Sequence, residues 1–426
     1  MKIYLIIFLL KICIFKTYLI LPFRREKKSF SNLTDYIFEK LNSHFLSYIQ
    51  IGEPFQIIPF NIEFYRFIYY ISNHPSNKIY NANKSLSFKE INKTKFSDKY
   101  IDTGYICNEN FQFNINNENK TIKDFNFFLV ETFQYNQRNF PACIGLGTKG
   151  YYSKLNENFI YQLKLSNIIK SYTFSIQFIN EDEGEIVIGE SLHEVKKNDF
   201  KNYNFAYTYL NNQFFQFEWA TKFENISIGN YSVYSDYYIV VFNLNLKGII
   251  VENHFLYRME NIFFNEFILD KKCKKDIISL EKVKYYFYHC EKDIKIDYSK
   301  LDNIYLRHKY LNMTFIINQK DLFEIYNDRI FYLVFSCINL ECDRNWVLGE
   351  QFIKKYPMSF NNDRKLFGIY QKKKIINKKF EIAYLFIFIL LIIIIILIII
   401  FSKYFKKNRK IRVNEINDEF FYIPTE

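Results

Sequence analysis

Glycine is scarce in this chain, with only 11 residues in 426, whereas an average protein contains about 7%. Tight turns must therefore often use asparagine, which tolerates a positive φ better than most residues do. Phenylalanine and tyrosine are in excess, at 48 and 36 residues. The hydrophobic content of 49% excludes a disordered chain, and the length is sufficient for two lobes with cores of their own.

Uncharged apolar runs long enough to cross a bilayer are confined to residues 382–401, with the sequence IAYLFIFILLIIIIILIIIF. At about 1.5 Å per residue, this segment can cross a hydrocarbon layer of about 30 Å as a helix. The apolar run in MKIYLIIFLLKICIF is shorter and is interrupted by Lys11. It suits a secretory signal or an N-terminal anchor, which we place at residues 1–23.

Basic residues flank the apolar segment on both sides, so the positive-inside rule barely discriminates between its two orientations. The N-terminal signal favours a single-pass type I protein, with a lumenal or external part and residues 402–426 in the cytosol. The endoplasmic reticulum, another secretory compartment and the cell surface all fit this topology. Much of the net charge of +12 comes from the flanking clusters, which favours membrane anchoring over nucleic-acid binding.

Metal-binding patterns are absent from the sequence. The cysteines lack the close pairwise spacing of a zinc site, and the six histidines form no ligand-like cluster. We therefore expect no metal and no cofactor. An even number of cysteines in an oxidising compartment favours disulfides, and six of the seven lie in the proposed lumenal part: Cys107, Cys143, Cys273, Cys290, Cys337 and Cys342.

The region between the two membrane-type segments is typical of an all-β protein. Runs such as YTFSIQFI and IFYLVFSCI are short, alternating and rich in β-branched and aromatic residues. Helical patterns are few, and the clearest are residues 155–167 and 256–268. The sequence therefore predicts an all-β architecture with minor helices.

Five segments, in order along the chain, resemble those of the pepsin-like aspartic proteases. They are YIQIGEPFQ, IYNANKSLSF, ACIGLGTKG with the strands that follow it, NQFFQFEWATKFENISIGN and NWVLGEQFIKKYPMSFNNDRKLFGIY. Each is weak alone, but their order makes the resemblance specific. It implies two similar lobes, at residues 29–195 and 196–371, with a substrate cleft between them. The membrane helix and the arrangement of the last four cysteines look most like the membrane-anchored plasmepsin branch.

This resemblance also implies disulfide pairs in the second lobe, Cys290 with Cys337 and Cys273 with Cys342. Cys107 and Cys143 then remain as a pair in the first lobe.

The catalytic motifs of the resembled family are degenerate in this chain. Counted from Pro54, the first catalytic aspartate falls on Glu63, followed by Phe64 and Tyr65 in place of Thr and Gly. The second is expected in GIIVENHFLYR, at Glu252, followed by Asn253 and His254. The family's mechanism needs two carboxylates about 3 Å apart that share one proton. Bulky neighbours beside two longer acidic side chains predict low or no peptidase activity.

The one Asp-Thr-Gly of the chain lies in YIDTGYI, residues 100–106. By the same resemblance it falls on the flap, a hairpin that closes over substrate, rather than on a catalytic loop. The flap residues are then Tyr100 or Ile101, with Thr103 and Gly104.

Three functions fit these expectations. The first, which we favour, is a pseudoprotease that holds an extended polypeptide or a partner protein in the interlobe cleft through strand-like hydrogen bonds. The second is an active aspartic endopeptidase with a Glu63/Glu252 dyad. The third is a surface scaffold or adhesion protein in which the cleft is filled. We expect the chain to be monomeric and to bind no nucleic acid.

Overall fold

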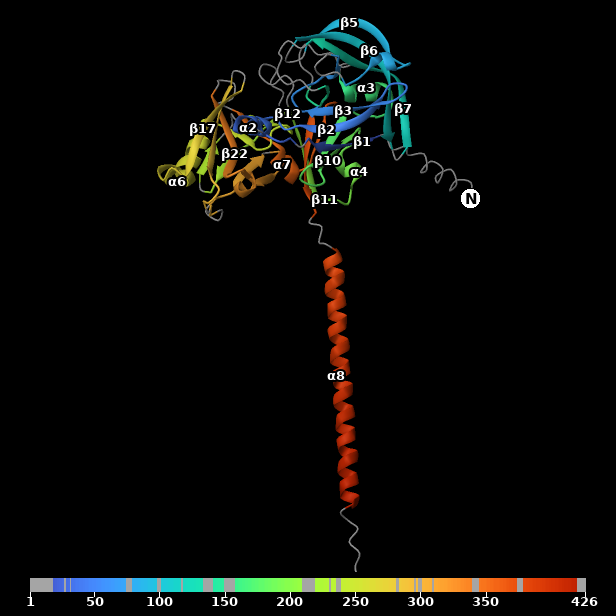
Figure 1. The fold of residues 1–426 in the computed structure, drawn as a ribbon, viewed down its shortest axis with the longest axis vertical. Coiled ribbons are helices and arrows are strands. Elements are labelled where there is room, and N and C mark those ends of the chain that lie inside the picture. The colour runs from blue at the N-terminus through green and yellow to red at the C-terminus, as the bar shows by residue number, and fades with distance from the viewer. Residues whose placement is uncertain are drawn as a thin grey trace, which may run out of the picture. The chain divides into compact units, whose positions relative to one another are not determined.

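The computed structural model describes residues 18–419 with several gaps. The gaps are 27, 31, 74–78, 98–100, 116–117, 133–140, 149–157, 209–218, 230, 235–238, 281–282, 295, 298–300, 309, 339–344 and 374–377. The chain forms two compact units, residues 1–372 and 373–426, which are described separately. The first unit is mostly β and has two lobes, one with β2, β3 and β7 and the other with β17 and β22 (Figure 1).

The largest sheet contains 13 strands in the order β11-β25-β24-β9-β10-β1-β2-β3-β8-β4-β7-β6-β5. The strands are β1 Leu19–Arg25, β2 Phe45–Ile51, β3 Gln56–Glu63, β4 Tyr69–Ser72, β5 Lys89–Ser97, β6 Ile101–Ile115, β7 Glu118–Thr132, β8 Ala142–Gly145, β9 Thr173–Phe178, β10 Glu183–Ile188, β11 Phe200–Tyr207, β24 Met358–Asn361 and β25 Leu366–Lys372. In β2 the apolar and polar faces alternate, so that Ile49 is buried and Tyr48 is exposed.

Two further sheets form the second lobe, one of eight strands and one of four. The first contains β12 Trp219–Lys222, β15 Ile239–Phe242, β16 Ile249–Val251, β17 Cys273–Leu280, β18 Val283–Glu291, β21 Phe323–Tyr326, β22 Arg329–Ile338 and β23 Asn345–Leu348. The second contains β13 Asn225–Ile228, β14 Tyr231–Tyr234, β19 Ile304–His308 and β20 Met313–Ile317.

Helices are short in the first unit. They are α2 Leu33–Leu41, η1 Ala82–Lys84, α3 Phe159–Leu165, α4 Leu192–Val195, α5 Asn253–Met259, η3 Glu260–Phe264, α6 Asn265–Leu269, η5 Gln319–Leu322 and α7 Glu350–Lys355. The two helical patterns of the sequence correspond to α3 and to the continuous helical segment from α5 to α6. The all-β class with minor helices is therefore confirmed.

The two lobes are joined by a shared antiparallel run of strands, β11-β25-β24-β9-β10-β1. Met358 of β24 pairs with Ile176 of β9, so that a strand near the end of the first unit is hydrogen-bonded to a strand from its middle. Trp219 adds a second link, because its indole Nε1 donates to the carbonyl of Leu146 at 2.8 Å. The core is continuous across this junction, with Phe174 and Phe360 stacked at a centroid distance of 5.0 Å.

Strand β1 corrects the boundary that we set for the N-terminal signal. Leu19, Leu21 and Phe23 are at most 4% exposed, and β1 pairs with β10 from Leu19 onward. A signal that ended at residue 23 would remove the centre of this strand, so the boundary of 1–23 lies too far along the chain. The sequence misled because a buried strand is as apolar as the end of a signal segment. Residues 1–17 lie outside the described part.

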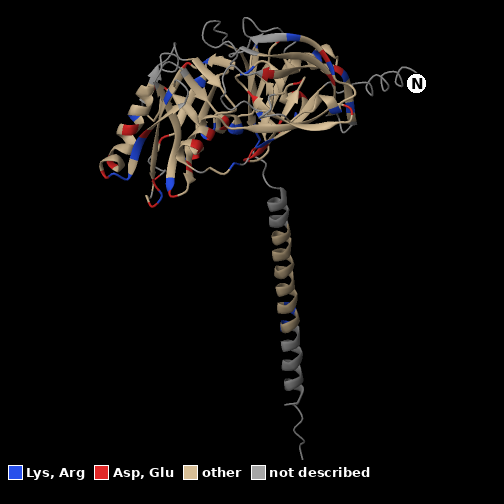
Figure 2. Ribbon diagram, turned by 45° about the horizontal axis from the view of Figure 1, so that its top comes forward, with Lys and Arg blue, Asp and Glu red and all other residues tan. Residues whose placement is uncertain are grey.

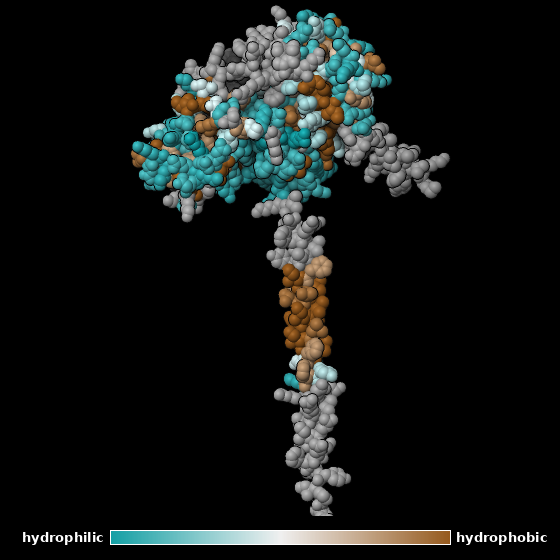
Figure 3. Space-filling view, in the orientation of Figure 1, coloured by the Kyte–Doolittle hydropathy of each residue, from teal (hydrophilic) through white to brown (hydrophobic). Residues whose placement is uncertain are grey.

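The second unit contains α8, Lys378–Glu419, which is long and apolar enough to cross a membrane between Phe386 and Lys406. The apolar stretch is exposed along its whole length, and Figure 3 shows it as a continuous hydrophobic surface. Figure 2 shows it free of charged residues up to the lysines at its end. The expected span, 382–401, overlaps this segment, which makes α8 a candidate transmembrane helix.

One buried histidine makes the stability of the second lobe depend on pH. His308 is 1% exposed, and its Nδ1 accepts a hydrogen bond from the N–H of Leu311 at 3.2 Å. The proton therefore lies on Nε2, which donates to Thr221 Oγ1 at 2.8 Å. Burial lowers the pKa of His308 from 6.5 to about 4.

Because the folded pKa of His308 lies below the unfolded one, its contribution to stability is complete above about pH 6.5 and is lost as the pH falls towards 4. We expect the free energy of unfolding to decrease by up to roughly 3 kcal/mol over this window. Denaturant unfolding of the wild type and of His308→Gln at several pH values tests this. A wild-type curve no steeper than that of the variant would contradict it.

Candidate functional site

The two lobes each contain the same three-strand arrangement around one loop. In the first lobe β3 runs parallel to β8, and β4 pairs antiparallel with the same strand. In the second lobe β15 runs parallel to β23, and β16 pairs antiparallel with it. The loop between β3 and β4 is therefore the counterpart of the loop between β15 and β16. These loops, residues 63–68 and 243–248, are called loop 1 and loop 2 below.

The register identifies the equivalent residues in the two loops. Glu63 at the end of β3 is opposite Gly145. In the second lobe Phe242 is opposite Leu348, which places the next residue, Asn243, level with Gly349. Asn243 is thus the counterpart of Glu63.

The two glycines have equivalent surroundings, which supports this register. A Cβ atom on Gly145 would lie 2.4 Å from the carbonyl oxygen of Ile68, in loop 1. On Gly349 it would lie 2.2 Å from the carbonyl oxygen of Gly248, the counterpart of Ile68 in loop 2. Neither position has room for a side chain, so each glycine lets its loop pack closely against the neighbouring strand.

Our expectation that Glu252 holds the second catalytic position is wrong in this register. Glu252 follows β16, the strand after loop 2, and its counterpart in the first lobe is Ser72 at the end of β4. It precedes α5 and is 7% exposed. The error arose because β15 and β16 are both apolar and only the second is followed by an acidic residue.

Glu63 is a buried carboxylate with two polar partners. It is 2% exposed, and its Oε2 lies 2.7 Å from Nε of Arg66, three residues along loop 1. Oε1 accepts a hydrogen bond from the Asn61 amide at 3.0 Å. Arg66 is itself buried and stacks over the Tyr70 ring at 5.4 Å. The negative charge is therefore balanced within the loop that carries it.

The residues after Glu63 face different surroundings. Phe64 is 1% exposed and makes edge-to-face contacts with Phe174 and Phe360, in the core that joins the lobes. Tyr65 is half-buried, and burial, followed by the Glu63 charge, raises its pKa well above the ordinary value. Its hydroxyl therefore stays protonated. In loop 1, a core residue and a phenol stand where the resembled family has threonine and glycine.

Loop 2 presents amides in place of acids. The Asn243 side-chain oxygen accepts the N–H of Asn245 at 2.9 Å, which closes a turn within the loop. Asn245 reaches across to the first lobe, where its Oδ1 accepts the N–H of Phe64 at 3.1 Å. Its Nδ2 donates to the carbonyls of Ile62 at 2.8 Å and Ser43 at 3.0 Å. Asn245 therefore braces loop 1 from the opposite lobe.

This arrangement limits the chemistry that the two loops can perform. A carboxylate pair that shares a proton needs two acids, and one of the two equivalent positions holds Asn243, which has no acidic proton. The other holds Glu63, which is paired with Arg66. Water activation by a shared-proton dyad is therefore not available from these residues. The sequence predicted Glu63 but not Arg66, Asn243 or Asn245. One signal could have revealed Asn243: each loop begins six residues before the next strand, Glu63 before β4 and Asn243 before β16.

The Asp-Thr-Gly segment lies in a β-hairpin and in neither loop. Ile101, Asp102, Thr103 and Gly104 belong to the beginning of β6, which pairs antiparallel with β5. Tyr100 and the connection between these strands lie outside the described residues. The role of the hairpin as a flap stays a prediction.

His254 and Asn253 lie at the start of α5 and are both exposed. Asn253 accepts a hydrogen bond from Ser336 Oγ at 2.8 Å. Both line a surface depression of the second lobe with Tyr257, Lys275 and Tyr286. His254 therefore lies on α5 and not in loop 2.

The disulfides differ from the expected pairs. Cys273 is bonded to Cys290, its direct neighbour across β17 and β18. The expected partners, Cys342 for Cys273 and Cys337 for Cys290, are therefore wrong. Cys337 is also disulfide-bonded, and Cys342 lies outside the described residues.

No disulfide joins Cys107 to Cys143, which are buried thiols. Strands β4 and β7 lie between the strands that carry them. Three strand spacings of about 4.8 Å exceed the Cα distance of about 7 Å that a disulfide tolerates.

Among the described residues, no group of three or more His, Cys, Asp or Glu side chains is arranged to hold a metal ion.

Neither a family model nor a curated protein sequence matches the chain. Among solved structures, it is similar to conglutin gamma, a basic 7S globulin from lupine seeds, with a TM-score of 0.60 and 10% identity over 83% of this chain and 94% of that one. It is also similar to basic 7S globulin from soybean, with a TM-score of 0.58 and 11% identity over 83% and 96% of the two chains. Both globulins are pepsin-like folds, and at this identity the likeness is one of fold alone. The chain therefore has the bilobal pepsin-like fold, followed by an apolar helix that is a candidate membrane span.

Proposed function

We propose that the chain is a membrane-anchored pseudoprotease of the secretory pathway, which binds a polypeptide or protein partner between its lobes without cutting it. One observation carries the proposal: the strand register makes Glu63 and Asn243 equivalent, so that only one of the two positions holds an acid. That acid, Glu63, is paired with Arg66. The fold is retained while the acid pair is not. A single-pass type I anchor, in the endoplasmic reticulum, elsewhere in the pathway or at the cell surface, and a kinship with the membrane-anchored plasmepsin branch are parts of this proposal.

The alternative of an active endopeptidase with a Glu63/Glu252 dyad finds no support in the geometry. Glu252 lies one strand beyond loop 2, on the N-terminal side of α5. The Glu63 carboxylate is engaged by Arg66 and Asn61. We therefore assign the charged and amide side chains of loop 1 and loop 2 a structural role, in which their polar contacts hold the lobes in register.

The proposal is tested by incubating the full-length protein in detergent micelles with a denatured, fluorescently labelled protein from about pH 3 to about pH 7, the range in which carboxylate dyads operate. We expect no cleavage by the wild type or by the Glu63→Gln variant, with an active pepsin-like enzyme in the same detergent as control. Cleavage that disappears in Glu63→Gln would overturn the proposal.

Binding is measured on the same samples from the anisotropy of the intact labelled protein. We expect saturable binding that weakens in Tyr65→Arg, which places a charge at the half-buried position beside Glu63. The exposed substitution Tyr207→Arg serves as control. The absence of any binding would favour the scaffold alternative.

A further inference from the structure

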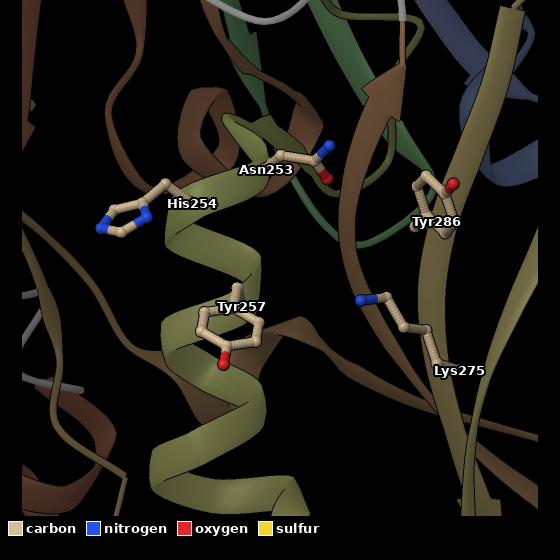
Figure 4. Close-up of a pocket in the computed structure, with 5 residues that line it drawn as sticks. All are labelled: Asn253, His254, Tyr257, Lys275 and Tyr286. Atoms are coloured by element: carbon tan, nitrogen blue, oxygen red, sulfur yellow. The ribbon is translucent and has the colours of Figure 1, made fainter.

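The surface depression of the second lobe is formed by three elements. It has a volume of about 420 Å³ and is lined by Asn253, His254 and Tyr257 of α5, by Lys275 of β17 and by Tyr286 of β18. Lys275 is opposite Tyr288 in the register of the two strands, and Ile277 is opposite Tyr286, so these side chains share the strand face on which the depression lies. Figure 4 shows the Lys275 ammonium and the Asn253 amide pointing into the space between Tyr257 and Tyr286, whereas His254 points to the other side of α5.

The groups that line this space are mainly hydrogen-bond donors. The Oδ1 atom of Asn253 already accepts a hydrogen bond from Ser336, so the donor that this amide offers to a ligand is its Nδ2 group. The hydroxyls of Tyr257 and Tyr286 make no hydrogen bond within the described part of the chain. Tyr257 is 54% exposed. A ligand that satisfies these donors must itself be rich in acceptor oxygens.

Lys275 supplies the positive charge. Its Nζ lies 3.0 Å from Glu260 and 5.5 Å and 5.7 Å from the ring centres of Tyr286 and Tyr288. Glu260 also accepts the Tyr288 hydroxyl, so it remains hydrogen-bonded when Lys275 turns to another partner. A partly exposed ion pair of this kind contributes little to stability. The remaining N–H groups of the ammonium can therefore bind an incoming anion at little cost.

One edge of the depression is formed by β17. Lys271 and Lys272 are exposed in the turn before this strand, whereas Lys274 lies on the strand face opposite to that of Lys275. This strand is the last in its sheet, so its outer edge can accept an extended segment. Ile277 on the same strand is 56% exposed, and together with the two tyrosines it provides apolar contact area beside the charge.

We propose that this depression is a docking site for an acidic segment of a polypeptide partner. A carboxylate of that segment binds Lys275 and the Nδ2 group of Asn253, while Tyr257 and Tyr286 pack against its aliphatic atoms. The site uses no residue of loop 1 or loop 2, so it goes beyond the binding proposed between the lobes and does not depend on it. Tyrosines beside a single ammonium favour a peptide carboxylate over a polyphosphate, which clusters of arginine and lysine bind better.

The test uses the full-length protein in detergent micelles and a fluorescein-labelled hexaglutamate peptide, with binding followed by anisotropy at low salt. We expect saturable binding that Lys275→Gln weakens about tenfold, or about 1.4 kcal/mol, because the variant loses a charge-assisted hydrogen bond to the peptide. Tyr257→Ala and Asn253→Ala should each weaken it several-fold. Hexaglutamine should not bind.

The matched control is Lys89→Gln, which removes an exposed lysine of the first lobe that also pairs with an acid, Asp124. Its affinity for the probe should equal that of the wild type. If Lys89→Gln and Lys275→Gln weakened binding equally, the effect would be one of net charge and the proposed site would be wrong. Competition by a neutral oligosaccharide would also contradict it. If the protein binds denatured protein but not hexaglutamate, the docking site is wrong while the proposed function stands. If it binds hexaglutamate but not denatured protein, the reverse holds.

Discussion

Replacing Arg66 with methionine should lower the free energy of unfolding by about 3–5 kcal/mol, because it leaves the Glu63 carboxylate buried without a countercharge. Glu63 is 2% exposed and Arg66 is 5% exposed, so water cannot take the place of the guanidinium without opening loop 1. Methionine retains much of the aliphatic volume, which limits the cavity. Denaturant unfolding followed by the fluorescence of Trp219 and Trp346, both buried and the only two tryptophans of the chain, measures the change.

A second variant separates the charge from the packing. In Glu63→Gln with Arg66→Met, no charge remains in the core, and stability should recover to within about 1–2 kcal/mol of the wild type. Lys93→Met is the control, because it removes a lysine that is 65% exposed and pairs with Glu131, and it should leave the stability close to that of the wild type. If the double variant were as unstable as Arg66→Met, the ion pair would not be the reason for the loss.

The fold could be predicted from the sequence because its local patterns are redundant. The segment NWVLGEQF contains an apolar strand, a glycine with no room for a side chain and a helix start, and the structure has β23, Gly349 and α7 in these places. Five such segments in order constrain the topology even where each is weak alone. Glu63 was located in the same way, by counting from the hairpin that contains Pro54.

The second half of the site could not be located by the same means. Loop 2 has Asn243 where an acid was sought, so the search moved to the next acidic residue after an apolar run and reached Glu252. Only the pairing of β15 and β16 with β23 distinguishes the two strands. The disulfide between Cys273 and Cys290 was missed for a similar reason, since it depends on the register of β17 with β18. Long-range pairing is a property of the whole chain and leaves little trace in a local pattern.

Asn245→Ala should lower the free energy of unfolding by about 3–5 kcal/mol, although it removes only a small polar side chain. The amide makes three hydrogen bonds to backbone groups of the first lobe, at Phe64, Ile62 and Ser43. Asn245 is 1% exposed, and each buried backbone group left without a partner costs about 1–3 kcal/mol. The loss is less than the full sum because the lobes can separate slightly and admit water.

The comparison with Asn204→Ala tests whether the bridging role of Asn245 is responsible. Asn204 makes one side-chain hydrogen bond, to the carbonyl of Leu311 at 2.7 Å, so its loss should cost about 1 kcal/mol. Asn245→Asp should be at least as harmful as Asn245→Ala, because a carboxylate keeps the acceptor for Phe64 but places a negative charge against two carbonyl oxygens. A stability loss for Asn245→Ala no greater than that for Asn204→Ala would show that loop 2 does not brace loop 1. The pseudoprotease proposal would then lose its account of how the lobes stay in register without an acid pair.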